Sequence, residues 1–409
     1  MTQNKILVKL LPRKEESILR FHPWIFSGAI ACVEGEVYDG AIVQVASHKG
    51  EPLGIGHWAD GSIAVRMLSF ISNEEIDASY WENRLSAALE LRIKMGLIRS
   101  KDDRRKENDV YRLIHGEGDQ LPGLIIDIYG QTAVIQSHSM GMHLCREAIT
   151  DAIVAVYQDL LPSSPLQAVY YKSSGTLPTK ESRELCEDGF LYGHSEAIPV
   201  LENGIQFLPD WIRGQKTGFF IDQRENRELV EQYAKDKTIL NAFCYTGGFS
   251  LYALRGDAKQ VDSLDSSSKA MYLTDKHVEL NYGDCPRHHS ITQDAFEYLD
   301  QMPEGQYDMI ILDPPAFAKH RRVLKNALIG YRRINSQAFK KIAPGGILFT
   351  FSCSQAVSKE EFRLAVFTAA AASGRHVRIL HQLTQPIDHP INIYHPEGEY
   401  LKGLVLQVE

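Results

Sequence analysis

The sequence predicts an α/β protein with a C-terminal Rossmann-like sheet, preceded by a small β-barrel and an α+β middle domain. From about residue 200, continuous apolar segments of strand length alternate with helical segments, which is typical of a mostly parallel sheet covered on both faces. Before that, residues 5–70 contain short β-rich segments between turn residues. Because 409 residues are many for one core, we expect three domains, with boundaries at 1–72, 73–190 and 191–409.

The composition is that of an ordinary globular protein, with 44% hydrophobic and 23% charged residues. No apolar run approaches the roughly 18–20 residues that a membrane span needs, and the N-terminal segment MTQNKILVKLLPRKEE lacks the apolar core of a secretory leader. The six cysteines are scattered without a CxxC pair, which argues against a zinc site or a disulfide framework. We therefore expect a cytoplasmic protein that has no membrane partner and no bound metal.

The N-terminal barrel is expected from four short β-rich segments: KILVKLL, AIVQVAS, LGIGHWA and SIAVRML. The segment HPWIFSGAI places Trp24 and Phe26 two residues apart, on one face of a strand. The simplest interpretation puts these aromatic side chains in the barrel core. HPWIFSGAI, followed by GAIVQVASHKGEPLGIGHWADGSIAVRML, also resembles a PUA domain, which is a small RNA-binding barrel.

The middle region has the pattern of an α+β domain. Residues 74–95 have helical apolar spacing, and the charged tract at 98–109 is typical of a solvated loop. A helix from Met142 to Tyr157 follows the next strands, which are VYRLIHGEG, LIIDIYG and TAVIQSH, and the strand AVYYKSS comes after it.

Three polar residues in this region alternate beside a turn: His115, Glu117 and Asp119. Such a set can ligate a metal, but alternate residues beside a turn more often face solvent. We expect solvent-facing side chains here.

The segment KTILNAFCYTGGFS, residues 237–250, predicts the ligand-binding corner of the Rossmann-like sheet. It reads as a short strand from Thr238 to Phe243, a turn of small residues and the start of a helix. Gly247 and Gly248 let the backbone approach a ligand, and a helix N-terminus presents free N–H groups. Strand, glycine turn and helix together are typical of nucleotide binding in a doubly wound sheet.

Three carboxylates follow the next three strands of this sheet. Asp265 ends QVDSLD, where an acid can accept both ribose hydroxyls, and Asp294 ends SITQD, within reach of an adenine amino group. Asp313 ends YDMIILD, at the substrate side. Because a helix starts directly after Asp294, this residue also fits an N-cap, and we expect both roles to operate together.

The turn chemistry distinguishes between nucleotide cofactors. A dinucleotide oxidoreductase would carry G-x-G-x-x-G where this chain has CYTGGFS, and the Lys-Ser/Thr pair of a phosphate-binding P-loop is also missing. Asp313-Pro314-Pro315 after the fourth strand is typical of methyltransferases that modify nucleic-acid bases with S-adenosylmethionine. We therefore expect a methyltransferase that binds S-adenosylmethionine.

Cys353, in FTFSCSQ, ends the fifth strand, next to the strand that leads into Asp313. Carbon 5 of a pyrimidine is too weakly nucleophilic to take a methyl group directly, and a thiolate that adds to carbon 6 makes it enamine-like. Most cysteines are buried small hydrophobes instead. The position beside the DPP turn favours the nucleophile, whereas Cys244 within the glycine turn is interpreted as a packing residue.

The segment 319–341, KHRRVLKNALIGYRRINSQAFKK, contains eight lysines and arginines and no aspartate or glutamate. In a chain of net charge −8, such a segment favours contacts with RNA phosphates. The alternative is a solvated helix face, which normally intersperses acids.

The whole chain resembles the bacterial 23S rRNA cytosine-5 methyltransferases with an N-terminal PUA domain. The matching segments are HPWIFSGAI, EGDQLPGLIIDIYG, GQKTGFFIDQRENR, LNAFCYTGGFSLYAL, ILDPPAFAK, GYRRINSQAFKKIAPGGILFTFSCS and HPEGEYLKG. The resemblance implies PUA, α+β and methyltransferase domains, a homodimer, and as RNA partner 23S rRNA or the assembling large subunit. It also implies that Cys353 is the nucleophile and that Asp313 hydrogen-bonds the cytosine.

The cofactor-binding set follows from the resemblance and from the strand ends together. In GQKTGFFIDQREN, basic and amide groups on a glycine-hinged segment could hold the methionine carboxylate. The expected cofactor-binding residues are Lys216, Thr217, Gln223, Arg224, Phe243, Tyr245, Thr246, Gly247, Asp265, Ser267, Asp294, Ala295 and Asp313.

One departure concerns the end of the reaction. Many RNA cytosine-5 methyltransferases have a second cysteine after the DPP-type proline, where this chain has Ala316 and Phe317. The base that removes the carbon-5 proton is therefore unassigned. Two alternatives stay open: guanine-N7 methylation of 23S rRNA, which needs no thiol, and a non-catalytic RNA-binding factor in ribosome assembly.

Overall fold

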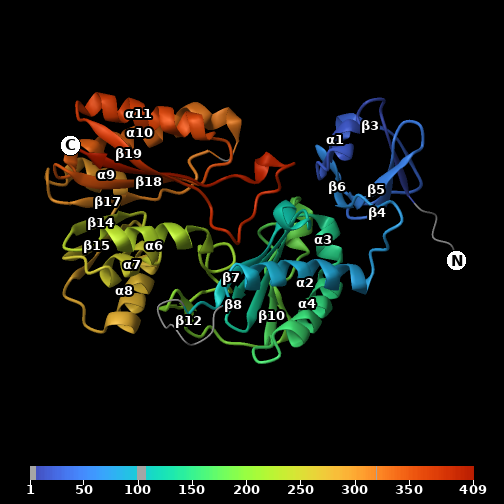
Figure 1. Ribbon diagram of the computed structural model, residues 1–409, viewed down its shortest axis with the longest axis horizontal. Coiled ribbons are helices and arrows are strands. Elements are labelled where there is room, and N and C mark those ends of the chain that lie inside the picture. Colours follow the sequence, from blue (N-terminus) through green and yellow to red (C-terminus); the bar gives the residue numbers. More distant parts are fainter. Residues whose placement is uncertain (1–5, 99–106, 319) are drawn as a thin grey trace. The chain divides into compact units, whose positions relative to one another are not determined.

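The computed structural model describes residues 6–98, 107–318 and 320–409 (Figure 1). Its contacts divide the chain into two compact units. The first unit comprises residues 1–204, 208–221 and 387–398, and the second comprises residues 205–207, 222–386 and 399–409. The predicted α/β class, with an N-terminal barrel-like sheet and a C-terminal Rossmann-like sheet, is confirmed.

The first unit begins with a six-stranded sheet in the order β2-β6-β5-β4-β1-β3. Its elements are β1 (Leu7–Leu10), α1 (Glu16–Leu19), β2 (Trp24–Phe26), β3 (Ile30–Glu34), β4 (Ile42–Ala46), β5 (Pro52–Trp58) and β6 (Ile63–Ser69). The small core inside this sheet consists of aliphatic side chains such as Val8, Val43 and Val65. Burial of these aliphatic side chains therefore stabilises the sheet.

The expectation that the aromatics of HPWIFSGAI form this core is wrong. Strand β2 turns Ile25 inward, with 2% of its surface exposed, so its neighbours on either side face away from the core. Phe26 is 48% exposed, and Trp24 is half-buried, with its Nε1 donating to Glu117 at 2.7 Å. The two aromatic side chains thus remain at or near the surface of the barrel.

The five-stranded sheet of the first unit has the order β11-β10-β9-β8-β7. Helices α2 and α4 pack together against it, and α2 begins at its N-cap Asp77, whose side chain accepts from the Tyr80 N–H (Figure 1). The predicted helix from Met142 to Tyr157 is divided at Cys145 into two helices. The elements are α2 (Ala78–Lys94), β7 (Val110–His115), β8 (Leu124–Tyr129), β9 (Thr132–Ser137), α3 (Met140–Leu144), α4 (Arg146–Leu160), β10 (Ala168–Tyr171), α5 (Lys180–Glu184), β11 (Gly189–Gly193) and β12 (Val200–Glu202).

Residues 387–398 belong to the first unit, although they follow most of the Rossmann-like strands in the sequence. Arg92 on α2 is fully buried and forms a two-pronged ion pair with Asp119, at 2.6 and 2.8 Å. The same guanidinium donates to the main-chain oxygen of Asp388 at 3.0 Å. A buried ion pair therefore anchors the segment 387–398 to the middle domain. Strand β11 crosses the expected boundary at residue 190, and the three-domain division stays a prediction.

The solvent-facing interpretation of His115, Glu117 and Asp119 is also wrong. All three are half-buried, and the last two are held by Trp24 and Arg92 respectively. Burial, together with the neighbouring His389 and Arg112, holds the pKa of His115 well below its usual range. These side chains therefore join elements within the first unit.

The second unit contains a seven-stranded sheet in the order β16-β15-β14-β17-β18-β20-β19. The first five of these strands pair in parallel, whereas β20 runs antiparallel to both β18 and β19. Helices α6, α7 and α8 cover one face, and α9, α10 and α11 cover the other (Figure 1). This arrangement agrees with the apolar, doubly covered strands that the sequence predicts.

The strands of the second unit are β13 (Ile205–Phe207), β14 (Thr238–Ala242), β15 (Gln260–Asp265), β16 (His288–Thr292), β17 (Met309–Leu312), β18 (Gly346–Ser352), β19 (Val377–Leu383) and β20 (Lys402–Val408). Its helices are α6 (Arg224–Tyr233), α7 (Gly248–Arg255), α8 (Ser268–Tyr282), α9 (Ala295–Gln301), α10 (Leu324–Lys341) and α11 (Lys359–Ser373). Within the described residues, no helix has the length and apolar character required to cross a membrane.

Replacing Arg92 with methionine should lower the free energy of unfolding of the first unit by about 3–5 kcal/mol, because Asp119 would remain as a buried charge without its partner. Urea unfolding followed by circular dichroism measures the loss. The control is Lys94→Met on the same helix, whose side chain is exposed, and its effect should stay within about 0.5 kcal/mol. Equal unfolding midpoints for Arg92→Met and the control would contradict the anchoring role.

Candidate active site

The loop after β14 has an unusual backbone. Phe243, Tyr245 and Gly247 have φ values of 61°, 49° and 79°, which lie in the left-handed region. Non-glycine residues rarely adopt this conformation, and each costs about 1–3 kcal/mol unless the surroundings hold it. Such strain is concentrated at ligand clamps and active sites. Two such non-glycine residues within three positions make this loop a candidate for ligand binding.

Side chains from β15 and α8 hold this loop through three hydrogen bonds. The Tyr245 N–H donates to Asp265 Oδ2 at 3.0 Å, and the hydroxyl of Thr274 donates to the Tyr245 carbonyl oxygen at 3.0 Å. His277 Nδ1 donates to the carbonyl oxygen of Thr246 at 2.9 Å. These contacts fix the loop in the conformation that its φ values alone would disfavour.

Gly247 could not be any other residue in this arrangement. A Cβ atom there would lie 2.6 Å from Cγ2 of Thr274, in addition to the positive φ. Helix α7 begins with the next residue, and its free N–H groups lie at the carboxyl end of β14. The glycine lets a ligand come close to the backbone, and the helix N-terminus offers N–H donors. Together they can bind the carboxylate or ribose of a nucleotide-type cofactor.

The Asp265 carboxylate has enough acceptor positions to bind a ligand as well as the loop. Its Oδ1 accepts from the Ser267 N–H at 2.9 Å, while the Ser267 hydroxyl caps α8 through the Ala270 N–H. A carboxylate has about four acceptor positions, and these contacts together with Tyr245 use two of them. Because the Asp265 side chain is half-buried, the remaining positions suit two ribose hydroxyls.

Asp294 is an N-cap, as one of its two expected roles requires. Its Oδ1 accepts from the N–H groups of Phe296 and Glu297, at 2.9 and 3.1 Å. Ala295 is the first residue of α9 and is buried. The Asp294 side chain is exposed, so its capping role leaves the second oxygen at the carboxyl edge of the sheet.

The four cofactor-binding residues expected in GQKTGFFIDQREN are divided between the two units. Lys216 and Thr217 belong to the first unit, where the buried Thr217 hydroxyl donates to Asp127 Oδ2 at 2.6 Å. Lys216 is exposed, with its Nζ 4.4 Å from the centre of the Phe220 ring. Within the first unit, the Thr217 hydroxyl therefore joins two segments of the polypeptide.

Gln223 and Arg224 belong to the second unit and are both buried. Gln223 Oε1 accepts from the Asn226 side-chain amide at 2.6 Å. The two residues lie where α6 begins, with Arg224 as its first residue.

The loops after β17 and β18 bring Asp313 and Cys353 to the same edge of the sheet, because these strands are parallel neighbours. The Sγ atom of Cys353 lies 3.9 Å from the carbonyl oxygen of Pro314. The hydroxyl of Ser354 donates to the carbonyl oxygen of Ala318. The half-buried thiol is therefore held against the DPP turn.

Tyr331 on α10 completes this region, and sequence reasoning missed it. Its hydroxyl accepts from the Ser352 hydroxyl at 2.8 Å, and its ring lies 4.7 Å from that of Phe317. Burial raises the pKa of Tyr331 to about 12, with smaller contributions from negative charge at Cys353 and Asp313. A neutral phenol therefore supports the end of β18.

Lys402 was missed as well, although the sequence carries a signal for it. It stands alone as a charged residue in the strand LKGLVLQV, and its Nζ donates to main-chain oxygens of the loop after Cys353. Cys244, by contrast, packs against Met271 at 3.6 Å between their sulfur atoms, as a buried hydrophobe does.

Acidic residues from other helices contact the basic segment 319–341. Arg321 forms an ion pair with Glu361 at 3.1 Å, and Arg333 forms one with Asp300 at 2.8 Å. Lys319 lies outside the described residues. The remaining strongly exposed cations of the segment are Arg322, Lys325, Arg332 and Lys340.

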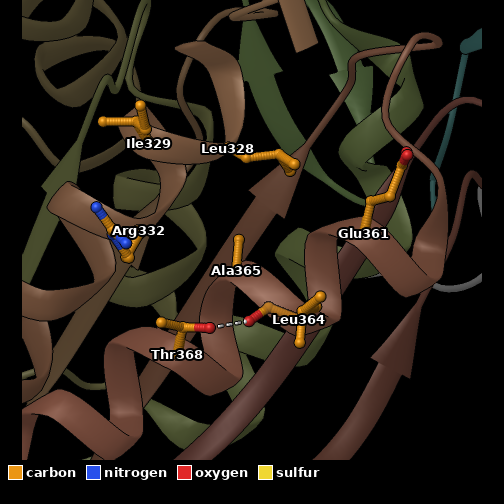
Figure 2. A pocket seen from close by; sticks show the side chains of 7 residues that line it. All are labelled: Leu328, Ile329, Arg332, Glu361, Leu364, Ala365 and Thr368. Atoms are coloured by element: carbon orange, nitrogen blue, oxygen red, sulfur yellow. Dashed lines mark hydrogen bonds between the residues drawn. The ribbon is translucent and has the colours of Figure 1, made fainter. Parts of the chain in front are cut away.

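A hollow between α10 and α11 lies apart from the predicted site residues (Figure 2). The side chains that line it are Leu328, Ile329, Arg332, Glu361, Leu364, Ala365 and Thr368. None of the predicted site residues lines this hollow, whose walls combine apolar side chains with Arg332, Glu361 and Thr368.

Gly247→Ala should weaken S-adenosylmethionine binding by at least about tenfold, because the added methyl group meets Thr274 and displaces the loop. Isothermal titration calorimetry measures the affinity. The control is Gly305→Ala, whose φ of +73° carries the same backbone strain but whose Cβ would meet no atom within 4 Å. Wild-type affinity in Gly247→Ala would contradict the assignment of this loop.

Comparisons with known proteins address the identity of the chain. Residues 180–395, more than half of the chain, match the family described as S-adenosylmethionine-dependent methyltransferase, and residues 8–70 match the PUA-like domain. A protein from Streptococcus mutans assigned to the SAM-dependent methyltransferases shares the fold, with a TM-score of 0.80, 22% identity and coverage of 98% of this chain and 100% of that one.

Full-length relatives are more similar in sequence. Ribosomal RNA large subunit methyltransferase I from Aeromonas salmonicida is 39% identical over 98% of this chain and 99% of its own length. The protein of the same name from Tolumonas auensis is 40% identical, with coverage of 98% of both chains. The chain therefore belongs to the S-adenosylmethionine-dependent methyltransferases, in the group of relatives named ribosomal RNA large subunit methyltransferase I.

Proposed function

We propose that this methyltransferase transfers the methyl group of S-adenosylmethionine to carbon 5 of a cytosine in 23S rRNA, with Cys353 as the nucleophile. The observation that carries the proposal is the position of the thiol. It lies at the end of β18, with Sγ 3.9 Å from the carbonyl oxygen of Pro314 in the DPP turn. The names of the full-length relatives support ribosomal RNA of the large subunit as the substrate.

The thiolate of Cys353 adds to carbon 6 of the cytosine, and the electrons of the 5,6 double bond move to carbon 5. When bound, S-adenosylmethionine would supply the electrophilic methyl group that carbon 5 accepts, and the neutral thioether S-adenosylhomocysteine would leave. A base then removes the carbon-5 proton, the 5,6 double bond forms again and the thiolate leaves. We propose that Asp313 hydrogen-bonds the cytosine and so favours the addition.

The base that removes the carbon-5 proton at the end of the reaction is unassigned. The two positions after the turn, Ala316 and Phe317, carry no titratable side chain. The Phe317 ring instead packs on Tyr331, whose phenol is neutral at physiological pH.

We propose that the cofactor is held by the strained loop and the strand ends around it. Asp265 would accept the ribose hydroxyls, and Asp294 would contact the adenine amino group with the oxygen that does not cap α9. The further residues proposed to bind it are Lys216, Thr217, Gln223, Arg224, Phe243, Tyr245, Thr246, Gly247, Ser267, Ala295 and Asp313.

We propose that RNA is bound through the PUA domain and through the exposed cations of the basic segment. The surface position of Phe26 and the half-buried Trp24 support the first contact, because unstacked bases pack on aromatic side chains. The exposed Arg322, Lys325 and Lys340 support the second. The same proposal places the enzyme in the cytoplasm as a homodimer that acts on 23S rRNA or on the assembling large subunit.

Cys353→Ala should reduce methyl transfer to 23S rRNA by at least about a thousandfold, because no other group takes the place of the nucleophile. Its affinity for S-adenosylmethionine should remain within about twofold of wild type. The control is Cys32→Ala, since Cys32 is an exposed cysteine of β3. Nucleoside mass spectrometry of the product should find 5-methylcytidine.

Two other results would replace this proposal. If Cys353→Ala keeps its activity and the product is 7-methylguanosine, the enzyme transfers the methyl group directly to guanine N7. If the wild-type protein binds 23S rRNA but methylates no nucleotide in it, the protein acts as a binding factor in ribosome assembly.

A further inference from the structure

The lysine at the start of β20 is an anomaly. Lys402 is only 5% exposed, in a strand whose other residues are uncharged and, apart from the half-buried Gln407, buried. Gly403 follows it because a Cβ atom there would lie 2.6 Å from the ring of Phe351 on β18. An ammonium group is costly to bury unless it meets compensating charge or strong acceptors. The hydrogen-bond acceptors and charges around the Lys402 ammonium group should therefore indicate its role.

Its acceptors all lie in the loop that follows the proposed nucleophile. Lys402 Nζ donates to the carbonyl oxygen of Ser354 at 2.6 Å and to that of Val357 at 2.8 Å. Hydrogen bonds from an ionised donor are the strong ones. Lys402 pairs across the two strands with Ser352, so its side chain starts beside the end of β18. The ammonium group thus fixes both ends of the short loop after Cys353.

The same loop is connected to the DPP turn. The Ser354 hydroxyl donates to Ala318, while the Ser354 carbonyl oxygen accepts from Lys402. A continuous chain of hydrogen bonds therefore runs from β20 through the cysteine loop to the loop after Asp313. A shift of the ammonium group would move the thiol relative to that turn.

The charges around Lys402 point in the same direction. Burial lowers the pKa of Lys402 to about 8, and negative charge at Cys353 is the largest influence that raises it. Of the other charged groups nearby, Glu399 pairs with Lys359 and Glu361 pairs with Arg321. These two carboxylates therefore have cations of their own. By reciprocity, the Lys402 ammonium group stabilises a thiolate at Cys353.

On the side of the thiol, Tyr331 on α10 feels the charges of both Cys353 and Asp313, and Asp313 directly follows β17. Asp313 is acidic and Tyr331 is neutral, so neither supplies positive charge. Lys402 supplies positive charge that acts on the sulfur of Cys353.

We propose that Lys402 is a positioning residue for methyl transfer, whose buried ammonium group holds the cysteine loop against the DPP turn and stabilises the Cys353 thiolate. The proposal rests on the proposed role of Cys353 as nucleophile. It adds a source for the reactivity of that thiol.

The test is the rate at which iodoacetamide alkylates Cys353 in the full-length protein as a function of pH, followed by mass spectrometry of the Cys353 peptide. In Lys402→Met, which keeps the length of the side chain without its charge, the half-maximal pH should rise by about one unit. Alkylation at pH 7.5 should then be several-fold slower. The control Lys276→Met, on the exposed surface of α8, should behave as wild type. An unchanged profile in Lys402→Met would overturn the proposal.

Steady-state kinetics distinguish a role of Lys402 in positioning the thiol from a role in binding RNA. Lys402→Met should lower kcat for RNA methylation while KM for RNA stays within about twofold, because Lys402 is buried away from the phosphate contacts. A change confined to KM would overturn the positioning role.

A second measurement covers the case in which Lys402→Met does not fold. In Cys353→Ala, Lys402 should lose its proton at a lower pH than in wild type, as followed by NMR of lysine labelled with ¹³C and ¹⁵N. Identical titration would overturn the proposal. Alkylation and lysine titration need neither RNA nor methyl transfer, so they remain valid if the cytosine assignment fails, which Cys353→Ala activity tests separately.

Discussion

The parallel pairing of β14, β17 and β18 is the constraint on which the active site depends. Its register aligns Ala242 with Leu312, and Leu312 with Thr350, in one row across the sheet. The chain leaves all three strands just beyond this row, at the glycine loop, at Asp313 and at Cys353. The Asp313 N–H donates to the Ala242 carbonyl oxygen at 3.5 Å, which continues the pairing to the edge. Three loops distant in sequence therefore meet because their strands end together.

Hydrogen bonds then convert this proximity into fixed geometry. The carboxylate of Asp265 holds the strained glycine loop on one side, and the Ser354 hydroxyl joins the cysteine loop to the DPP loop on the other. Neither side depends on a flexible surface side chain. The site is thus preorganised by the backbone, which suits a reaction whose partners must be aligned before transfer.

The local features of the site could be predicted because they are encoded in short segments. An apolar strand, a glycine turn and an aspartate at each strand end need no knowledge of distant residues, and they placed Gly247, Asp265 and Cys353 on the correct elements. The features that could not be predicted depend on partners far away in sequence. Arg92 meets Asp388 across almost three hundred residues, and nothing local indicates that the segment 387–398 leaves the second unit.

The predictions of an acid-free basic surface and of buried aromatic residues in β2 were wrong because both depend on residues outside the segment. The segment 319–341 contains no acid, yet Glu361 and Asp300 from other helices pair with two of its arginines. In β2, the two aromatic residues suggested that their own face is buried, whereas the buried face is that of Ile25 between them. Lys402 alone offered a usable local signal, a charged residue in an apolar strand, and its meaning appeared only with the loop above it.

The covalent bond itself tests the central claim most directly. An RNA substrate that carries 5-fluorocytidine in place of cytidine cannot lose a proton from carbon 5, so the enzyme should stay attached after methyl transfer. We expect a denaturation-resistant protein–RNA complex that requires S-adenosylmethionine and whose cross-linked peptide contains Cys353. A wild-type enzyme that methylates unmodified RNA but forms no such complex, or forms it through another residue, would contradict the account.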